Sequence, residues 1–159
     1  MTCKARSTLL VGVLGLGVLV ADTARAQDPG FLGVKDVHIV VEDLGQEGRA
    51  CNVTEDGIDA AIRLPLDASR LRLNEKSADF IYANVSVRRR DDVECVAYVS
   101  LSLYRRLSTP EGQFVPGAVW HKGIVMGGGA MSDFVQRVDQ RIGDLTKQLI
   151  AEWIKANPR

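Results

Sequence analysis

The chain has 159 residues, and its 20 Lys and Arg balance its 20 Asp and Glu. This length suits one domain. The balance argues against the strongly basic surface with which nucleic-acid-binding proteins hold phosphates, so we expect no nucleic acid partner.

The first 26 residues have the three parts of a secretory signal peptide in their usual order. Lys4 and Arg6 supply the positive start, 9–20 is an apolar run, and Ala24 and Ala26 frame a small-residue cleavage site. The run is too short to cross a bilayer as a helix, which needs about 20 apolar residues, and no later segment is apolar enough. We therefore expect cleavage near Ala26 and a periplasmic or secreted product.

Cleavage would leave 133 residues with 17 basic and 19 acidic side chains, because three basic residues and one acidic residue lie in the first 26. A balance of −2 gives the mature chain no general electrostatic attraction to an anionic membrane. A chain of this size can bury roughly two-thirds of its surface without a structural metal. We expect a flexible leader over 27–35 and a single α+β domain over 36–157.

A short β-rich run over 37–42 opens the domain. Thr54 then precedes two acidic residues, which predicts a helix that starts with a hydroxyl cap. Apolar residues at helical spacing extend this helix over 55–63. Pro65 lacks a backbone donor, so the helix either ends before it or continues with a kink to Ser69.

Two runs with period-two alternation predict a β-hairpin in the centre of the chain. The first covers 81–88, the second covers 95–103, and the polar turn between them lies at 90–92. One face of each run is apolar, whereas the other carries tyrosine and small polar residues. We therefore expect one buried face and one wetter face.

The last third of the chain predicts a loop over 110–116, a strand over 118–126 and a glycine turn at 127–129 into a long amphipathic helix. The apolar stripe of that helix runs from Phe134 to Trp153 and needs a sheet face to cover it. The predicted fold is therefore α+β. An antiparallel sheet of about four strands is covered on one face by the short helix and the long C-terminal helix.

Two cysteines remain after cleavage, Cys51 and Cys95. An even number in an oxidising compartment favours a disulfide, and Cys95 lies on the apolar face of the hairpin, where it can meet Cys51 near the first helix. A pair of buried free thiols is one alternative, and a redox or metal site is another. Neither cysteine has a CxxC partner or a histidine near it in sequence, so we predict the disulfide, no metal site and no cofactor.

His38 and His121 are the only histidines, and each falls in a predicted strand. Neither belongs to an HxH, HxxxH or HExxH pattern, and no nucleophile motif accompanies them. Asp36 is two residues from His38 on the same strand face, which suits a carboxylate–imidazole hydrogen bond. A structural or exposed histidine explains the pattern better, so we assign no catalytic residue and keep a site around His38 or His121 as an alternative.

The polar face of the hairpin is the candidate binding surface, because tyrosine offers contact area with a polar tip. Its residues are Tyr82, Asn84, Tyr98, Ser100 and Tyr104. An ordinary solvent-facing sheet surface has the same composition. The arginines at 88–90 and 105–106 also have two interpretations: charges that protect the hairpin edges, or a docking patch for an acidic partner or an anionic glycan.

Three stretches of the chain resemble small exported bacterial proteins of unassigned function. They are Val53–Ile58, Ile81–Val85 and Ala97–Leu103. The likeness extends to a Trp-bearing strand, at Trp120 here, and to a long helix that finishes near Asn157 and Pro158. The order of elements is similar to that of helix-on-sheet domains in envelope assembly and secretion accessories. These likenesses imply no catalytic residue, and Pro65 departs from the unbroken first helix that they imply.

We predict a non-enzymatic exported domain that binds an envelope protein or a glycan through its sheet face or an edge strand. The alternatives are a small enzyme and a small-ligand carrier with a pocket between the sheet and the terminal helix. A long, exposed, unpaired edge strand would favour the binding domain. A histidine and a carboxylate in hydrogen-bond contact within a pocket would favour the enzyme, and a large cavity lined by aromatic side chains would favour the carrier.

Overall fold

The structure is a computed structural model that describes residues 30–90, 94–127 and 131–158. In chain order its elements are β1 (Asp36–Val41), α1 (Gly45–Ala50), α2 (Glu55–Asp67), β2 (Arg72–Leu73), β3 (Phe80–Arg89), β4 (Cys95–Ser108), β5 (Phe114–Met126) and α3 (Met131–Ala156). The strands form one sheet in the order β2-β1-β3-β4-β5. The predicted signal peptide and cleavage site, the hairpin turn at 91–92 and the glycines at 128–129 lie outside the described residues.

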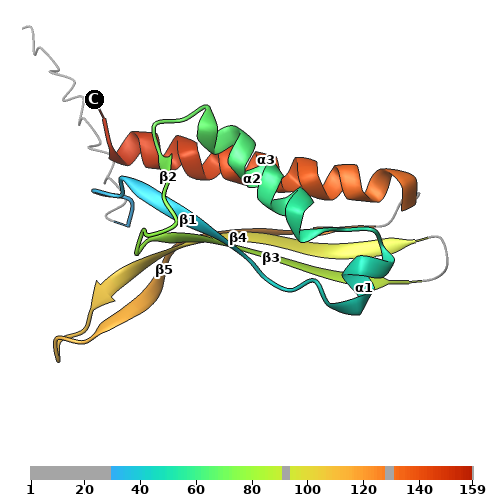
Figure 1. Ribbon diagram of the computed structural model, residues 1–159, viewed down its shortest axis with the longest axis horizontal. Coiled ribbons are helices and arrows are strands. Elements are labelled where there is room, and N and C mark those ends of the chain that lie inside the picture. Colours follow the sequence, from blue (N-terminus) through green and yellow to red (C-terminus); the bar gives the residue numbers. More distant parts are fainter. Residues whose placement is uncertain (1–29, 91–93, 128–130, 159) are drawn as a thin grey trace, which may run out of the picture.

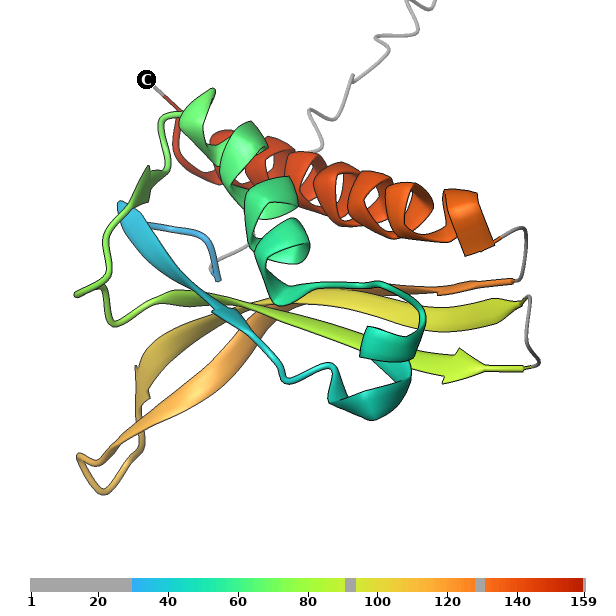
Figure 2. The ribbon, with the colours of Figure 1, turned by 45° about the vertical axis from the view of Figure 1, so that its right-hand side comes forward.

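Two helices form a second layer on one face of the sheet (Figure 1). They pack against each other, and α3 lies over β4 while α2 lies over β1, as the turned view also shows (Figure 2). The apolar stripe of α3 supplies Phe134, Ile142 and Leu149 to the core, all fully buried. The predicted α+β architecture with a long C-terminal helix is therefore confirmed.

The sheet differs from the prediction in strand number and direction. It has five strands and is mixed, because β1 runs parallel to both β2 and β3. The chain between β1 and β3 crosses over through α1, α2 and β2, and such a crossover allows two neighbouring strands to run in the same direction. β2 has only two residues, too few to show a period-two pattern, so it was not predicted.

The central hairpin is confirmed with its predicted faces. Its register runs from Phe80 opposite Tyr104 to Arg89 opposite Cys95. β5 starts earlier than predicted, at Phe114, because β4 continues to Ser108 and pairs with it. The expected loop over 110–116 is therefore shorter. Pro116 lies within β5, which is tolerated because β5 is an edge strand.

α2 begins as predicted and runs through its proline. The Thr54 hydroxyl accepts a hydrogen bond from the Gly57 N–H at 3.1 Å. The helix ends at Asp67, although a proline inside a helix removes one hydrogen bond. Ile62 and Leu66, on either side of Pro65, are both buried. Their packing therefore continues the helix where the local preference favours a break.

Residues 30–35, expected to belong to a flexible leader, contribute to the core. Phe31 and Val34 are buried, and hydrogen bonds tie this segment to the end of α3. The Trp153 indole N–H donates to the Val34 carbonyl at 2.8 Å. The Asn157 amide donates to the Phe31 carbonyl at 2.9 Å and accepts from the Gly33 N–H at 3.0 Å. The two ends of the described chain therefore meet at one end of the fold.

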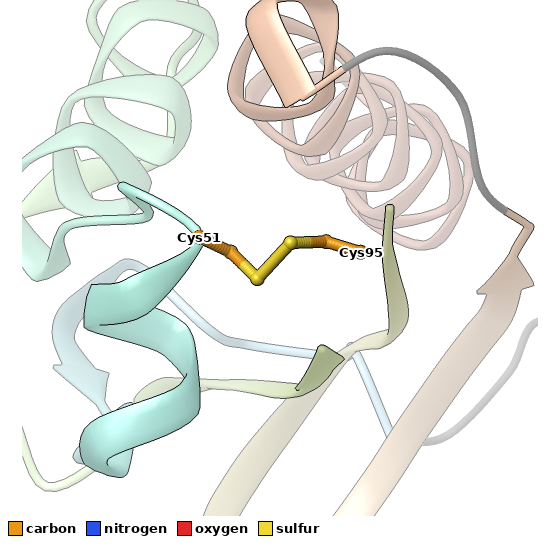
Figure 3. Close-up of a disulfide and its surroundings, with 2 residues drawn as sticks. All are labelled: Cys51 and Cys95. Carbon is orange, nitrogen blue, oxygen red and sulfur yellow. A yellow bond between two sulfur atoms is a disulfide. The ribbon is translucent and has the colours of Figure 1, made fainter. Parts of the chain in front are cut away.

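Cys51 and Cys95 form a disulfide in the structure, as predicted (Figure 3). Cys51 directly follows α1, and Cys95 is the first residue of β4. Both side chains are fully buried, and their Cα atoms are 6.3 Å apart. The bond therefore ties the α1 segment to the sheet.

Candidate functional site

The sheet face opposite α2 and α3, called the open face below, holds all five residues of the predicted binding surface. The register pairs Tyr82 with Ser102, Asn84 with Ser100, Ser86 with Tyr98, and Phe80 with Tyr104. The same face carries both histidines, because His38 is opposite Phe80 and His121 is opposite Ser102. The structure thus brings the predicted residues together on one surface and places the histidines beside them.

Most polar groups of the open face already have partners within it. The Asn84 amide donates to Glu42, and a hydrogen bond between Tyr82 and Glu42, reinforced by burial, raises the pKa of the Tyr82 phenol. Ser100 and Ser102 are only 5% and 6% exposed. A partner that binds flat on this face would therefore compete with hydrogen bonds that the protein makes itself.

The aromatic side chains of the open face also contact one another. Phe80 and Tyr104 are stacked with ring centroids 5.0 Å apart, and Tyr82 meets Tyr104 edge-on at 6.0 Å. His38 packs on the other side of Phe80 at 5.2 Å. Such contacts stabilise aromatic pairs beyond their burial alone. This cluster is thus part of the structural packing of the open face as well as a candidate contact surface.

The two histidines have different surroundings. His38 Nδ1 lies 3.0 Å from the Ser77 carbonyl oxygen, and within the described residues the expected contact between Asp36 and His38 does not form. His121 Nδ1 lies 2.8 Å from the Ser102 hydroxyl, and its Nε2 lies 3.4 Å from the Tyr98 hydroxyl. A serine–histidine pair suits nucleophilic catalysis when a third group orients the histidine. Here the group beside the second ring nitrogen of His121 is the Tyr98 hydroxyl.

The part of the chain that the structure describes holds no group of three or more His, Cys, Asp and Glu side chains that could bind a metal ion. Two arginines of the 88–90 cluster are engaged by acidic neighbours. Arg88 pairs with Glu47 at 3.2 Å, and Arg90 pairs with Glu94 at 3.3 Å. These pairs favour the edge-protecting interpretation of 88–90 over a free docking patch.

β5 forms one edge of the sheet and is 13 residues long. Among the described residues, no strand pairs with its outer side. Phe114 is 60% exposed and Val125 is 74% exposed. The sequence predicted a strand here but not its edge position, because alternation reveals the faces of a strand and not its neighbours.

A groove runs between β5 and α3. It contains two hollows of about 520 and 330 Å³ that share Ile124 and Arg141 as lining residues. The larger one is also lined by Tyr98, His121, Lys122, Gly123, Asp144, Leu145 and Gln148. Tyr98 and His121 are its only aromatic side chains, whereas a small-ligand carrier was expected to have a cavity lined mainly by aromatic residues.

Lys122, which lines the groove, belongs to a hydrogen-bonded cluster around Glu152. The Lys122 ammonium and the Trp120 indole N–H both donate to its carboxylate at 2.7 Å. Burial acts to raise the pKa of Glu152, but these hydrogen bonds and the positive charge of Lys122 outweigh it, so the pKa lies below its usual value. The cluster fixes the position of β5 relative to α3.

Tyr98 borders the groove because Gly123 leaves room for it. A Cβ atom at Gly123 would lie 2.3 Å from the Tyr98 hydroxyl oxygen. The tyrosine ring thus crosses the backbone of β5 from the neighbouring strand, as aromatic side chains do at glycines in sheets. One member of the predicted binding surface therefore also lies beside the sheet edge.

No family model matches the chain, and no curated protein matches it in sequence. Solved structures of similar architecture include a minor lipoprotein from Acinetobacter baumannii, with 14% identity, a TM-score of 0.38, and 79% of this chain and 96% of that one covered. PelC from Paraburkholderia phytofirmans, described as a dodecamer, has 17% identity and a TM-score of 0.45, with 74% of this chain and 87% of PelC covered. The rare lipoprotein B from Shewanella oneidensis has 7% identity and a TM-score of 0.29, with 76% of this chain and 92% of that one covered.

Two of these three proteins are thus bacterial lipoproteins. Within the described part of this chain, no helix combines the length and the apolar character that crossing a membrane requires.

Proposed function

We propose that this protein is an exported, non-enzymatic binding module that takes up an extended segment of an envelope protein along the outer side of β5. The observation that carries the proposal is the edge strand itself, because an unpaired strand edge presents backbone donors and acceptors ready to pair with another chain. β5 is 13 residues long, whereas β2 at the opposite edge has only two. β5 is therefore the edge that can hold a partner strand.

Two features support export. The first 26 residues have the pattern of a secretory signal peptide, and the two cysteines beyond it are joined in the structure. Disulfides form and persist in oxidising compartments and are rare in the bacterial cytosol. Both features fit a protein that works in the periplasm or outside the cell.

The part of β5 best suited to pairing is Trp120–Met126, which we call the docking edge. Natural edge strands are protected by prolines, bulges and outward charges. Pro116 and the irregular register opposite Leu103 and Tyr104 protect the first half of β5. The docking edge follows them, and its lysine points onto α3, where it pairs with Glu152. Seven residues match the length of an ordinary strand.

A strand added to the docking edge would place its side chains alternately on two surfaces. One set would enter the groove between β5 and α3, past Ile124 and Arg141. The other set would meet Tyr98 and Val125 on the open face. Backbone pairing would supply affinity, and these two surfaces would supply selectivity. The edge and the predicted tyrosine face thus contribute to one binding surface.

Adjacent proline substitutions provide the test. Successive N–H groups of an edge strand point alternately to the neighbouring strand and to solvent, so one of Ile124→Pro and Val125→Pro leaves the pairing with β4 intact. The variant that keeps the wild-type melting temperature is the informative one. It removes an outward donor and should abolish partner capture.

Capture is measured by photo-crosslinking in cells from a photoreactive amino acid at position 125, with Ser86 on the open face and Lys147 on α3 as control positions. We expect a crosslink from position 125 to one envelope protein. This crosslink should disappear when the variant that still folds carries proline at 124. If 125 is the position that tolerates proline, the photoreactive amino acid is placed at 124. Crosslinks that persist in the folded proline variant, or that arise equally from Ser86, would contradict binding at the edge.

The contact between Ser102 and His121 supports a second candidate, an acyl-transfer enzyme. The 2.8 Å distance is suitable for proton transfer from the hydroxyl. Ser102 is nearly buried, so the substrate would have to displace neighbouring side chains to reach it. Labelling of the wild type by a fluorophosphonate probe, absent in Ser102→Ala, would favour this candidate over the binding module.

A further inference from the structure

We propose that a hollow at the end of the fold where the two ends of the described chain meet binds phosphate groups of an anionic lipid surface. The hollow has a volume of about 510 Å³. It is lined by Gly33, Val34, Lys35, Asp36, Arg70, Arg72, Trp153, Asn157 and Pro158. It lies at the C-terminal end of α3, whereas the groove at the docking edge borders the middle of that helix. The proposal is thus independent of the binding at β5.

Three cations from separate segments converge on this hollow. Lys35 precedes β1, Arg70 lies in the connection after α2, and Arg72 begins β2. Asp36 is the only acidic residue in the lining. Guanidinium groups match the geometry of phosphate oxygens through paired N–H donors. The side chains thus present the donors that a phosphate group requires.

These cations are not neutralised by ion pairs within the described residues, in contrast to other surface cations of the protein. Arg63, Arg88 and Lys122 each lie within 4.0 Å of a carboxylate. Arg70 instead donates to the Asn157 carbonyl oxygen at 3.2 Å. A set of surface cations without carboxylate partners can accept an external anion without first breaking an internal pair.

The walls of the hollow are held in place before any ligand binds. The Arg70 guanidinium lies over the Trp153 ring, 5.4 Å from its centroid, and Trp153 is itself hydrogen-bonded to the Val34 carbonyl. Asn157 binds the backbone of the Gly33 segment at the same place. A prearranged site loses less conformational entropy when it binds.

The overall charge of −2 after cleavage does not oppose this binding. At physiological ionic strength the screening length is about 8 Å. A headgroup in the hollow therefore responds to Lys35, Arg70, Arg72 and Asp36 in its lining far more than to charges on distant parts of the surface. The net charge of the whole mature chain does not describe the local charge around the hollow.

The position of the hollow in the chain favours a lipid as the source of the phosphate. Gly33 lines it, and Gly33 is only the seventh residue after the expected cleavage site that follows Ala26. Seven residues span at most about 25 Å. While the apolar segment is still in the membrane, the hollow is thus held close to the lipid headgroups. A lipid surface is the phosphate source that the chain meets first.

Co-sedimentation of the mature protein with vesicles tests the proposal. Vesicles of phosphatidylglycerol mixed with phosphatidylcholine should bind it, whereas pure phosphatidylcholine should not. Each cation near an anionic surface contributes about fivefold to binding. We therefore expect Arg72→Gln to weaken binding about fivefold, and Lys35→Gln, Arg70→Gln and Arg72→Gln together to weaken it about a hundredfold.

The matched control removes three cations elsewhere, by Arg49→Gln, Arg88→Gln and Lys147→Gln, and changes the net charge by the same amount. It should bind as the wild type does. Equal losses in the two triple variants would overturn the proposal, because the net charge would then explain binding. Loss of Arg70 could disturb the packing of Trp153, which it contacts. The single variant Arg72→Gln tests the site without this effect, since Arg72 does not contact that ring in the structure.

Calorimetry with inorganic phosphate separates the two sources of the ligand. Vesicle binding that is lost in the hollow variants supports the lipid surface. Phosphate binding without vesicle binding would overturn it in favour of a soluble phosphate compound. Absence of both would overturn the site itself.

Discussion

Reduction of the Cys51–Cys95 disulfide should lower the free energy of unfolding by about 4 kcal/mol. The bond closes a loop with a sequence separation of 44 residues, and the chain-entropy model gives about 4 kcal/mol for a loop of that length. Both side chains are fully buried, and α1, which Cys51 follows, packs against β3, the strand that pairs with the start of β4. A single domain has a total stability of only about 5–15 kcal/mol, so the loss is a large fraction of it.

The assay is urea denaturation of the mature protein with and without reductant, followed by circular dichroism. The comparison changes no residue and breaks only the bond between the two sulfur atoms. Reduction should lower the midpoint and steepen the dependence on urea, because the open unfolded chain exposes more surface than the cross-linked one. The double variant Cys51→Ala with Cys95→Ala should respond to urea in the same way with and without reductant.

Coincident transitions of the oxidised and reduced wild type would refute the reasoning. Labelling of two thiols in the native, unreduced protein would refute it earlier, because no bond would then exist to reduce. A shift of the midpoint without a change in the urea dependence would contradict only the explanation by chain entropy. The loss of stability on reduction would then arise in the native state and not in the unfolded chain.

Two further predictions concern single side chains. Thr54→Ala removes the hydroxyl that accepts from the Gly57 N–H and should lower the free energy of unfolding, measured with heat or urea, by about 1 kcal/mol. Thr54→Ser should keep most of that stability. Equal losses in the two variants would exclude a capping role. The pKa of Glu152 is lower in the folded protein than its usual 4.5, so its stabilisation is present above that value and is lost as the pH falls through the folded pKa. Glu152→Gln should therefore be less stable than the wild type at neutral pH and converge with it in acid, and a difference that persists at low pH would place the effect in packing.

The predictable parts of the fold are those that short-range chemistry specifies. The central hairpin followed from period-two alternation, because successive side chains of a strand point to opposite faces. The start of α2 followed from Thr54, whose hydroxyl satisfies a backbone donor within one helical turn. The long stripe of α3 followed from its 3–4 spacing. In each of these elements the local pattern agrees with the burial that the structure shows.

Other parts depended on which segments became neighbours. β1 reads as an ordinary short strand, and its parallel pairing arises only because α1, α2 and β2 intervene before β3. Pro65 favours a break in isolation, whereas burial of Ile62 and Leu66 keeps the helix intact. Ser100 is polar and was expected on a wet surface, yet its neighbours on the open face bury it. Such outcomes depend on packing across strands and helices, which a linear pattern does not contain.

The candidate sites divide in the same way. The sequence alone predicted the export signal, the pairing of Cys51 with Cys95, and the tyrosine-bearing face, because each depends on residue type and near spacing. Tertiary structure decided that β5 is an edge strand, that a groove separates it from α3, and that Lys35, Arg70 and Arg72 share one hollow. The physical reason is that an edge and a hollow are properties of what lies next to a residue, and folding alone brings those distant segments together.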